Sequence, residues 1–187
     1  MRVAAVILAA GASTRLGEPK QLAMLGGERL LERAVRVAVE AGCTPVVVVL
    51  GAEAERILAE CDFRTADVVI NEAWREGMAA SIRAGVAAIA GVCDAAVVMT
   101  CDQPAVTADH LRKLAATCGE VPAASAYAGR KGVPACFAAG HFAELMNLHG
   151  DAGARSLLES AKAVDLESGE LDIDTLESLE AARTAFP

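Results

Sequence analysis

The feature that most limits how this chain can fold is a short apolar run, Val3 to Leu8, that leads directly into a glycine-containing loop. A continuous apolar run with β-branched residues predicts a strand buried on both faces. Similar runs at Val46 to Leu50 and Ala95 to Met99 are expected to lie beside it as parallel strands, with another strand at Asp67 to Ile70. In a sheet of this kind, the loop that follows a central strand is where ligands bind.

Helical patterns separate these strands and predict the layers that cover them. Apolar side chains from Glu28 to Ala41 fall on one face of a helix. Further helices are expected over Ala52 to Glu60, over Met78 to Ala90 and after Thr107, which is a suitable N-cap. The third of these helices is expected to turn four apolar side chains inward, namely Met78, Ile82, Val86 and Ile89. Alternating strands and helices predict an open α/β sheet with helices on both faces.

The pattern changes in the second half of the chain. Ala123 to Tyr127 and Val133 to Phe137 resemble two strands joined by a hairpin, so part of the sheet must be antiparallel. Helices are expected over Gly140 to Leu148, over Asp151 to Ala161, and from the N-cap Thr175 to Thr184. With no linker or repeat, the sequence predicts one three-layer, Rossmann-like α/β domain over residues 1–187, with a mostly parallel sheet and an antiparallel part in the C-terminal half.

Charge and composition exclude several classes of function. The net charge is -8 and no stretch concentrates Lys and Arg with aromatic residues, which argues against a nucleic-acid surface. No apolar run approaches the roughly 18 to 20 residues that cross a bilayer, and no signal-peptide cleavage pattern is visible, so we expect a cytoplasmic protein. The absence of an inserted arm or heptad run makes a monomer the default expectation.

The cysteines and histidines show no spacing typical of metal ligands. The six cysteines form no Cys-x-x-Cys pair, and we expect them to be reduced and mostly buried. The three histidines are isolated within helical stretches and are assigned no chemistry: His110, His141 and His149.

The loop after the first strand has the composition of a phosphate site, although it matches neither of the two best-known motifs. Gly-x-Gly-x-x-Gly and Gly-x-x-x-x-Gly-Lys-Ser/Thr are both absent. Gly11 lets the backbone approach a ligand, Ser13 and Thr14 offer hydroxyl donors, and Arg15 and Lys20 supply two cations. This combination suits a triphosphate; the alternative is an ordinary strand-to-helix turn with solvated charges.

The same loop carries a family resemblance. Its pattern, Leu8-Ala9-Ala10-Gly11-x-Ser13-x-Arg15-x-Gly17-x-x-Lys20, resembles the signature of the nucleotidyltransferases that mature the molybdenum cofactor. Leu-Ala-Ala-Gly is similar to the cytidylyltransferase branch, whereas guanylyltransferases tend to carry Leu-Ala-Gly-Gly. Four later segments agree in order: Asn71-Glu72-x-Trp74-x-x-Gly77-Met78-x-x-Ser81-Ile82-Arg83-x-Gly85, Cys101-Asp102-Gln103-Pro104, Gly132-Val133-Pro134 and Gly150-Asp151-x-Gly153-Ala154-Arg155.

This resemblance implies a nucleotide-diphospho-sugar transferase-like fold, with a nucleotide-binding half over residues 1–105 and an acceptor-binding half over residues 106–187. Arg15, Lys20 and Asp102 are expected to be catalytic. Trp74 is expected to pack beneath the base-binding segment rather than stack on a ligand. The residues expected to bind nucleotide are Leu8, Ala9, Ala10, Gly11, Ser13, Arg15, Lys20, Gly77, Ser81 and Asp102.

Two carboxylates are expected to hold Mg²⁺, with Mn²⁺ as a substitute. Asp102 follows the strand at Ala95 to Met99 almost directly, so its carboxylate should face the first loop. The resemblance places a late Asp or Asn at the metal, and Asp174 fits that position, with Asp172 as the fallback. The structural alternatives are that Asp102 caps the helix after Pro104, or that one late Asp supports the N-terminus of the last helix.

The acceptor site rests on three basic residues. Arg130 and Lys131 lie in the predicted hairpin and Arg155 lies one turn into a helix expected to be capped by Asp151, so the three could form a second anionic pocket. We therefore expect transfer of CMP from CTP to the terminal phosphate of molybdopterin or molybdenum cofactor, with release of pyrophosphate. A recipient molybdoenzyme would be a further partner.

Three alternatives to cytidylyl transfer stay open, and a fourth is disfavoured. Guanylyl transfer from GTP to the same cofactor and CTP transfer to another phosphorylated small molecule belong to the same reaction class. A non-catalytic insertion chaperone for the molybdenum cofactor is a third, although such a protein would not need both metal ligands. A nicotinamide-dependent oxidoreductase is disfavoured because Gly-x-Gly-x-x-Gly is missing.

Overall fold

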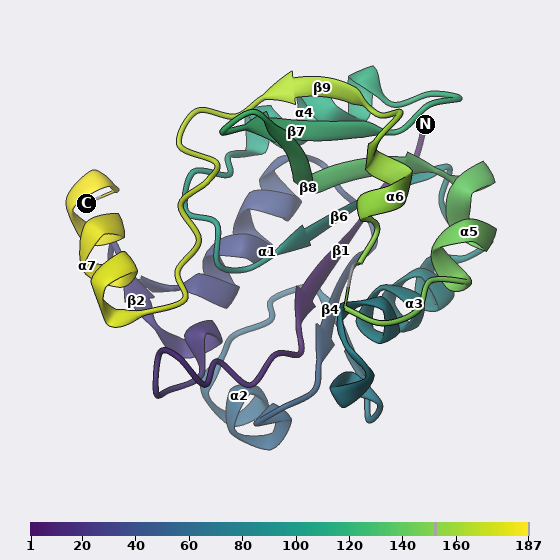
Figure 1. Ribbon diagram of the computed structural model, residues 1–187. Helices are drawn as coiled ribbons and strands as arrows, with labels where there is room; N and C mark the ends of the chain where they lie inside the picture. The colour runs from purple at the N-terminus through teal and green to yellow at the C-terminus, as the bar shows by residue number, and fades with distance from the viewer. Residues whose placement is uncertain (152, 187) are drawn as a thin grey trace.

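A computed structural model describes residues 1–151 and 153–186 as a seven-stranded sheet with helices on both faces (Figure 1). The order of strands across the sheet is β5-β4-β1-β6-β8-β7-β9. Within this sheet as described, β8 alone runs against the other strands, because it pairs antiparallel with both β6 and β7. The strands are β1 (Val3–Ala9), β4 (Val46–Leu50), β5 (Asp67–Ile70), β6 (Ala95–Thr100), β7 (Ala123–Tyr127), β8 (Arg130–Ala138) and β9 (Lys162–Asp165).

Strand β1 is buried on both faces, as its continuous apolar run predicts. Ala5, Ile7 and Ala9 contribute to the core on one side, where α1 (Leu30–Glu40) and α4 (Ala108–Thr117) pack. Val6 and Leu8 contribute to the core on the other side, beneath α3 (Met78–Ile89), α5 (Phe142–Met146) and α6 (Arg155–Leu158). Apart from the last helix, the other elements are short: α2 (Ala54–Glu60), β2 (Met24–Leu25), β3 (Glu28–Arg29) and the 3-10 turns Lys20–Leu22, Trp74–Glu76 and Ala139–His141.

A third apolar cluster attaches the last helix to the first loop. Helix α7 (Leu176–Ala185) packs beside β2 at the edge of the molecule (Figure 1), and Leu179 shares a cluster with Leu16 and Leu25. Ile173, just before α7, is fully buried in the same cluster. This packing brings a segment from late in the chain against the loop that follows β1.

The predicted strands, the hairpin and the Rossmann-like α/β class are confirmed. Two of the three predicted N-caps are present, since Thr107 accepts a hydrogen bond from the backbone N–H of His110 and Thr175 accepts one from Ser178. The predicted cap at Asp151 was wrong, because the helix begins later and its N-cap is Ala154. His110 itself is buried, with its Nε2 atom 2.7 Å from the Ser125 hydroxyl, which fits a packing role. The six cysteines are free, and Cys43, Cys101 and Cys136 are the buried ones.

Three further details of the prediction were wrong. The helix predicted from Asp151 to Ala161, in which residue 152 lies outside the described part of the chain, is reduced to α6 because Gly153 adopts a positive φ of 56° before it. Strand β9, which follows α6, was not predicted. Met78 is 42% exposed instead of facing inward, because it lies at the first position of α3, where its side chain lines a cavity. In residues 1–151 and 153–186, no helix is long and apolar enough to cross a membrane.

Gly85 sets how closely α3 approaches the sheet, which gives a testable prediction. A Cβ atom at Gly85 would collide with Val6 Cγ1 and lie 3.0 Å from Val49 Cγ2. Gly85→Ala should therefore destabilise the fold by about 1 to 2 kcal/mol, because overpacking exceeds the gain of about 1 kcal/mol in helix propensity. Urea unfolding measures this.

Gly140→Ala is the matched control, since a Cβ atom there meets nothing within 4 Å. Its free energy of unfolding should stay within about 0.5 kcal/mol of the original protein. If Gly85→Ala were as stable as the control, the close approach of α3 would not be a packing constraint.

Candidate active site

A cavity of about 740 Å³ opens at the carboxyl ends of β1 and β6. Strand β4 lies on one side of β1 and β6 on the other, so this is the point where the order of the sheet reverses. Open α/β sheets bind ligands at such points. The lining comes from the end of β1 and its loop, the end of β6, and the start of α3: Leu8, Ala9, Ala10, Gly11, Ala12, Thr14, Lys20, Gln21, Trp74, Arg75, Gly77, Met78, Ser81, Thr100, Cys101, Asp102 and Asp151.

The structure brings most of the predicted nucleotide-binding residues together around this cavity. Eight of the ten contribute to its lining: Leu8, Ala9, Ala10, Gly11, Lys20, Gly77, Ser81 and Asp102. Ser13 and Arg15 are not part of the lining. Trp74, which was expected to pack under the base-binding segment, lies against Gly51 and Ala10 and also forms part of the wall.

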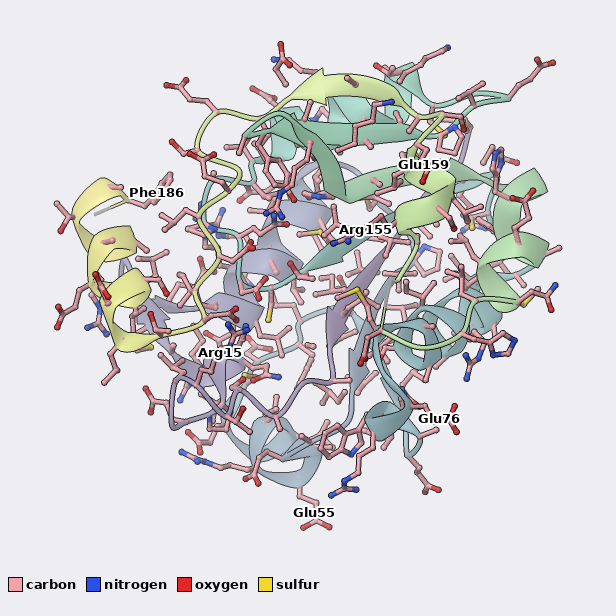
Figure 2. All side chains as sticks on the ribbon, viewed as in Figure 1. Arg15, Glu55, Glu76, Arg155, Glu159 and Phe186 are labelled. Atoms are coloured by element: carbon pink, nitrogen blue, oxygen red, sulfur yellow. The ribbon has the colours of Figure 1, made fainter. Side chains whose placement is uncertain are left out.

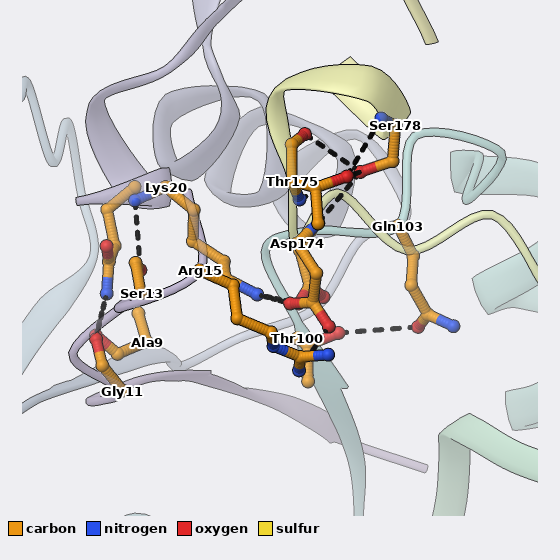
Figure 3. Close-up of polar contacts among 12 residues, drawn as sticks. Ala9, Gly11, Ser13, Arg15, Lys20, Thr100, Gln103, Asp174, Thr175 and Ser178 are labelled. Carbon is orange, nitrogen blue, oxygen red and sulfur yellow. Dashed lines mark hydrogen bonds and ion pairs between the residues drawn. The ribbon is translucent and has the colours of Figure 1, made fainter. Parts of the chain in front are cut away.

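Ser13 stabilises the first loop, residues 10–19, through hydrogen bonds within the loop and to Lys20. Its backbone has a positive φ of 52°, and its hydroxyl accepts a hydrogen bond of 3.0 Å from the Lys20 N–H (Figure 3). The Ser13 carbonyl accepts further bonds from Leu16 and Gly17. The hydroxyl predicted to donate to phosphate thus shapes the turn that carries Arg15 and Lys20.

Gln21 is a functional candidate that sequence reasoning missed. Its side chain is 1% exposed, and its Nε2 atom donates to the Ala9 carbonyl at 2.6 Å and to the Gly11 carbonyl at 3.2 Å. These bonds occupy two carbonyls of the cavity wall and fix the backbone there. A Gln inside the Lys20–Leu22 turn gave no signal of this role, because its partners lie ten or more residues earlier in the chain.

The centre of the site is a group of opposite charges drawn from both ends of the chain. The Lys20 ammonium lies 2.8 Å from Asp102 Oδ2 and also donates to Asp174 Oδ1, while Arg15 Nη2 lies 2.7 Å from Asp174 Oδ2. Figure 3 shows the Arg15 and Lys20 side chains directed at Asp174. Lys20 and Asp102 are each 15% exposed, whereas Arg15 is 73% exposed.

These contacts fix the charge states. Burial alone would lower the pKa of Lys20, but Asp102 and Asp174 outweigh it and raise that pKa well above its usual range. The hydrogen bond from Lys20 lowers the pKa of Asp174, with Arg15 adding to the effect. Both groups therefore carry their charge at neutral pH.

The backbone before α7 holds Asp174 in place. Ile173 N–H donates to the Asp102 carbonyl at 2.9 Å, which ties the two predicted metal-binding segments together independently of their side chains. Ser178 Oγ accepts from the backbone N–H groups of Asp174 and Thr175 at 3.0 Å each (Figure 3). In the described part of the chain, Asp172 to Asp174 form no strand, so Asp174 is held by the helix cap and by Ile173.

Asp172, the fallback metal ligand, makes neither of the ion pairs that hold Asp174. Burial raises the pKa of Asp172 to about 6, and repulsion from Asp102 and Asp174 adds to the rise, whereas Arg130 opposes it. The two late carboxylates thus differ in their surroundings. Asp174 forms ion pairs with Arg15 and Lys20, whereas Asp172 is more buried.

The far end of the cavity is built where α3 begins. Gly77 has a φ of 104°, and a Cβ atom there would collide with the Asp151 carboxylate, so only glycine fits. Ser81 is buried and accepts a hydrogen bond from Asn71 Nδ2 at 3.1 Å. The Arg75 guanidinium lies 4.3 Å from the centre of the Trp74 ring. Asp151 also lines the cavity, although it was not predicted to take part.

The three predicted acceptor residues lie apart from this cavity lining. Arg130 stacks at 5.3 Å over the Tyr127 ring, and Lys131 Nζ donates to the Glu159 carbonyl at 2.9 Å. Arg155 is exposed at the start of α6 and extends towards the middle of the view in Figure 2. In this structure the three do not form one pocket.

The donor set suits a hard divalent cation held by few protein ligands. Among the described residues, no group of three or more His, Cys, Asp or Glu side chains is arranged to hold a metal ion. Asp102 and Asp174 do converge on one cation, the Lys20 ammonium. Two carboxylates are enough for Mg²⁺ or Mn²⁺ when phosphate oxygens and waters complete the shell.

Three named proteins that bear on the function are similar in sequence to this chain. A nicotine blue oxidoreductase of Paenarthrobacter nicotinovorans is 36% identical, covering 95% of this chain and 94% of that protein. The purine catabolism protein PucB of Bacillus subtilis is 33% identical, covering 97% and 96%. A probable molybdenum cofactor guanylyltransferase of Opitutus terrae is 36% identical over a shorter match, 62% and 55%.

Solved structures agree with the fold and with the sequence family. Rv0371c of Mycobacterium tuberculosis superposes with a TM-score of 0.86 at 33% identity, covering 98% of both chains. The same protein has been solved as a complex with manganese, which matches with a TM-score of 0.81 at 30% identity and covers 99% of this chain and all of that one. A family model described as a MobA-like NTP transferase domain matches residues 5–165, and the chain therefore belongs to this nucleotidyltransferase family.

Proposed function

We propose that this protein transfers CMP from CTP to the terminal phosphate of molybdopterin or a molybdenum cofactor and releases pyrophosphate. The observation that carries the proposal is the convergence of Arg15 and Lys20 with Asp102 and Asp174 at the 740 Å³ cavity. Two cations for phosphates and two carboxylates for a divalent metal are the groups that phosphoryl transfer requires. The similarity to a probable molybdenum cofactor guanylyltransferase supports the acceptor class.

The preference for CTP rests on Ala10. This residue stands where the guanylyltransferase branch of the resembled family carries Gly, and it is buried in the cavity wall. Gln21 holds the carbonyls on both sides of Ala10, so the shape of the wall at this point is fixed. A rigid cavity wall can select a base by its shape and by the backbone N–H and C=O groups that remain available to bond the base.

Asp102 and Asp174 would hold the metal. When bound there, a divalent cation supplies charge neutralisation for the reacting phosphates. Their fit to such an ion follows from the hard oxygen donors and from the cation they already share, Lys20. The manganese complex of the similar Mycobacterium tuberculosis protein supports a divalent-metal site.

The chain's own residues act by positioning and by charge. Arg15 and Lys20 would bind the phosphates and stabilise the charge that builds on the departing pyrophosphate. The first loop, held by Ser13 and Gln21, presents its backbone to the nucleotide. The attacking phosphate is already ionised near neutral pH, so no strong general base is needed, and orientation in the cavity accounts for the rest of the rate.

Arg130, Lys131 and Arg155 are proposed to attract the phosphorylated acceptor. They lie outside the described cavity lining, so their role would be recruitment along the acceptor side rather than contact with the reacting phosphates. Arg155 is the best placed of the three, because Gly150 and Gly153, which precede it, contact the start of α3 at Ala79 and Met78.

Guanylyl transfer, CTP transfer to another phosphorylated molecule and cofactor delivery without catalysis are the other candidates. A further candidate is oxidoreductase activity on a small molecule, because the chain is similar to a nicotine blue oxidoreductase over most of both chains. A transferase consumes a triphosphate, needs a divalent metal and releases pyrophosphate, whereas a reductase consumes a hydride donor. Incubation with NADH or NADPH in parallel separates the two classes.

The deciding experiment compares triphosphates. Purified molybdopterin, Mg²⁺ and each of CTP, GTP, ATP and UTP are incubated with the protein, and the products are identified by mass spectrometry. We expect a cytosine dinucleotide and pyrophosphate from CTP. A guanine dinucleotide as the main product would replace the cytidylyl assignment, and no product from any triphosphate would exclude transfer to this acceptor.

Asp102→Asn tests the predicted metal ligand. The change keeps the size of the side chain but removes its charge, so turnover should fall at least roughly a hundredfold. Binding of CTP without metal should change little, since Asp102 is expected to reach the nucleotide through the metal. Asp109→Asn, at an exposed acidic position on α4, is the control and should retain full turnover. Substantial pyrophosphate release by Asp102→Asn would refute its role.

Arg15→Ala tests the exposed cation. We expect a loss of about 2 to 4 kcal/mol in transition-state stabilisation, or roughly 30- to 1000-fold in kcat/KM. The free energy of unfolding should hardly change, because an ion pair this exposed contributes little. Arg56→Ala is the matched control, since Arg56 forms an exposed pair with Glu60 on α2 and is not among the residues that line the cavity. Equal kcat/KM values for the two variants would remove Arg15 from the mechanism.

A further inference from the structure

The Lys20 ammonium occupies the place between the two carboxylates that the proposed metal would need. It lies 2.8 Å from Asp102 Oδ2 and donates to Asp174 Oδ1, and the remaining Asp174 oxygen accepts from Arg15. Lys20 and Asp102 are each 15% exposed and Asp174 is 32% exposed, so solvent screens the Lys20–Asp102 pair only in part. Two positive and two negative charges cancel within the group.

The two carboxylates do not depend on Lys20 for their proximity. The hydrogen bond from Ile173 N–H to the Asp102 carbonyl joins their backbones, and the buried Ile173 side chain and the Thr175–Ser178 cap fix the segment around Asp174. If the ammonium moves away, the pair remains together as an uncompensated double negative charge. Such a pair is an effective site for a divalent cation.

Lys20 can leave only if another anion receives it. Moving a cation out of a mostly buried ion pair without a new partner is strongly unfavourable, because it leaves the carboxylates uncompensated. Lys20 also lines the cavity where the triphosphate is expected, so a bound nucleotide supplies phosphate oxygens as the new partner. The carboxylates are then released.

We infer that Lys20 acts as an exchangeable cation, which holds the Asp102 and Asp174 carboxylates in the nucleotide-free protein and moves to the nucleotide phosphates when a divalent metal takes its place. The inference rests on the proposed function for its metal and nucleotide. Its consequence is that metal and triphosphate bind as a linked pair, with each strengthening the other by the same factor. The nucleotide-free protein should bind the metal weakly.

Mn²⁺ alone is the probe, and its binding to the full chain is measured by calorimetry and by the electron paramagnetic resonance signal of the free ion. Lys20→Met keeps the length of the side chain and removes its charge. We expect this variant to bind Mn²⁺ without nucleotide about tenfold more tightly than the original protein, within the range typical of coupled sites. Lys113→Met, at an exposed position on α4, is the control and should bind Mn²⁺ as the original protein does.

CTP and GTP are then added in turn. In the original protein, the nucleotide that binds should strengthen Mn²⁺ binding about tenfold, and this factor should shrink in Lys20→Met. Lys20→Gln, which is neutral but can still donate to the carboxylates, serves if Lys20→Met does not fold. For both variants, the rise in Tm caused by Mn²⁺ should exceed that of the original protein.

Mn²⁺ binding to the neutral variants that is no tighter than to the original protein would overturn the inference, even if transfer of CMP is observed. Tighter Mn²⁺ binding in the neutral variants supports it, even if no triphosphate is a substrate. The two proposals can therefore fail separately.

Discussion

Strand β1 is covered on both faces and hydrogen-bonded along both edges, and this complete burial is the constraint on which the rest of the structure depends. It pairs with β4 through Ala5 to Ala9 and with β6 through Val3 to Leu8. Strand β1 itself carries only apolar side chains, as expected where a polar group would be buried without a partner, so the chemistry begins where the strand ends. The backbone of the first loop then needs its own partners, which Ser13 and Gln21 supply.

The site is stable without a ligand because its charges cancel. Asp102 and Asp174 would repel each other if they were alone, and Arg15 and Lys20 remove that repulsion. The hydrogen bond from Lys20 lowers the pKa of Asp174 and so keeps that carboxylate ionised and ready for another cation. The same arrangement explains why a site with only two acidic ligands has a definite geometry before any ion is present.

The sequence predicts the parts of this molecule that depend on local chemistry. Apolar runs predict β1, β4 and β6, and hydroxyl side chains at Thr107 and Thr175 predict the starts of α4 and α7. Strand β9 escapes prediction because it lies at the sheet edge with only Val164 half-buried, so no clear alternation marks it. Met78 follows the helical spacing of core residues, yet its turn borders a cavity, and spacing does not distinguish a cavity wall from a core.

The site itself is predictable only in part, for a different reason. The residue types in the first loop indicate phosphate chemistry, and the position of Asp102 follows from the strand before it. The nearness of Asp174 came from family resemblance, since no local pattern reports a contact between residues so far apart. Gln21 and the Lys20 bridge depend on backbone carbonyls and carboxylates that are brought close only by the complete fold.

The contact between Arg15 and Asp174 spans 159 residues, and that separation has a consequence for the order in which the molecule forms during synthesis. The sheet from β5 to β6 uses only residues that leave the ribosome early, so it can assemble while the rest of the chain is still being made. The charge group closes only after the segment before α7 has emerged and docked. A nascent chain therefore carries the loop, and later also Asp102, without Asp174 until the last part of its translation, and the complete charge group forms only in that late step.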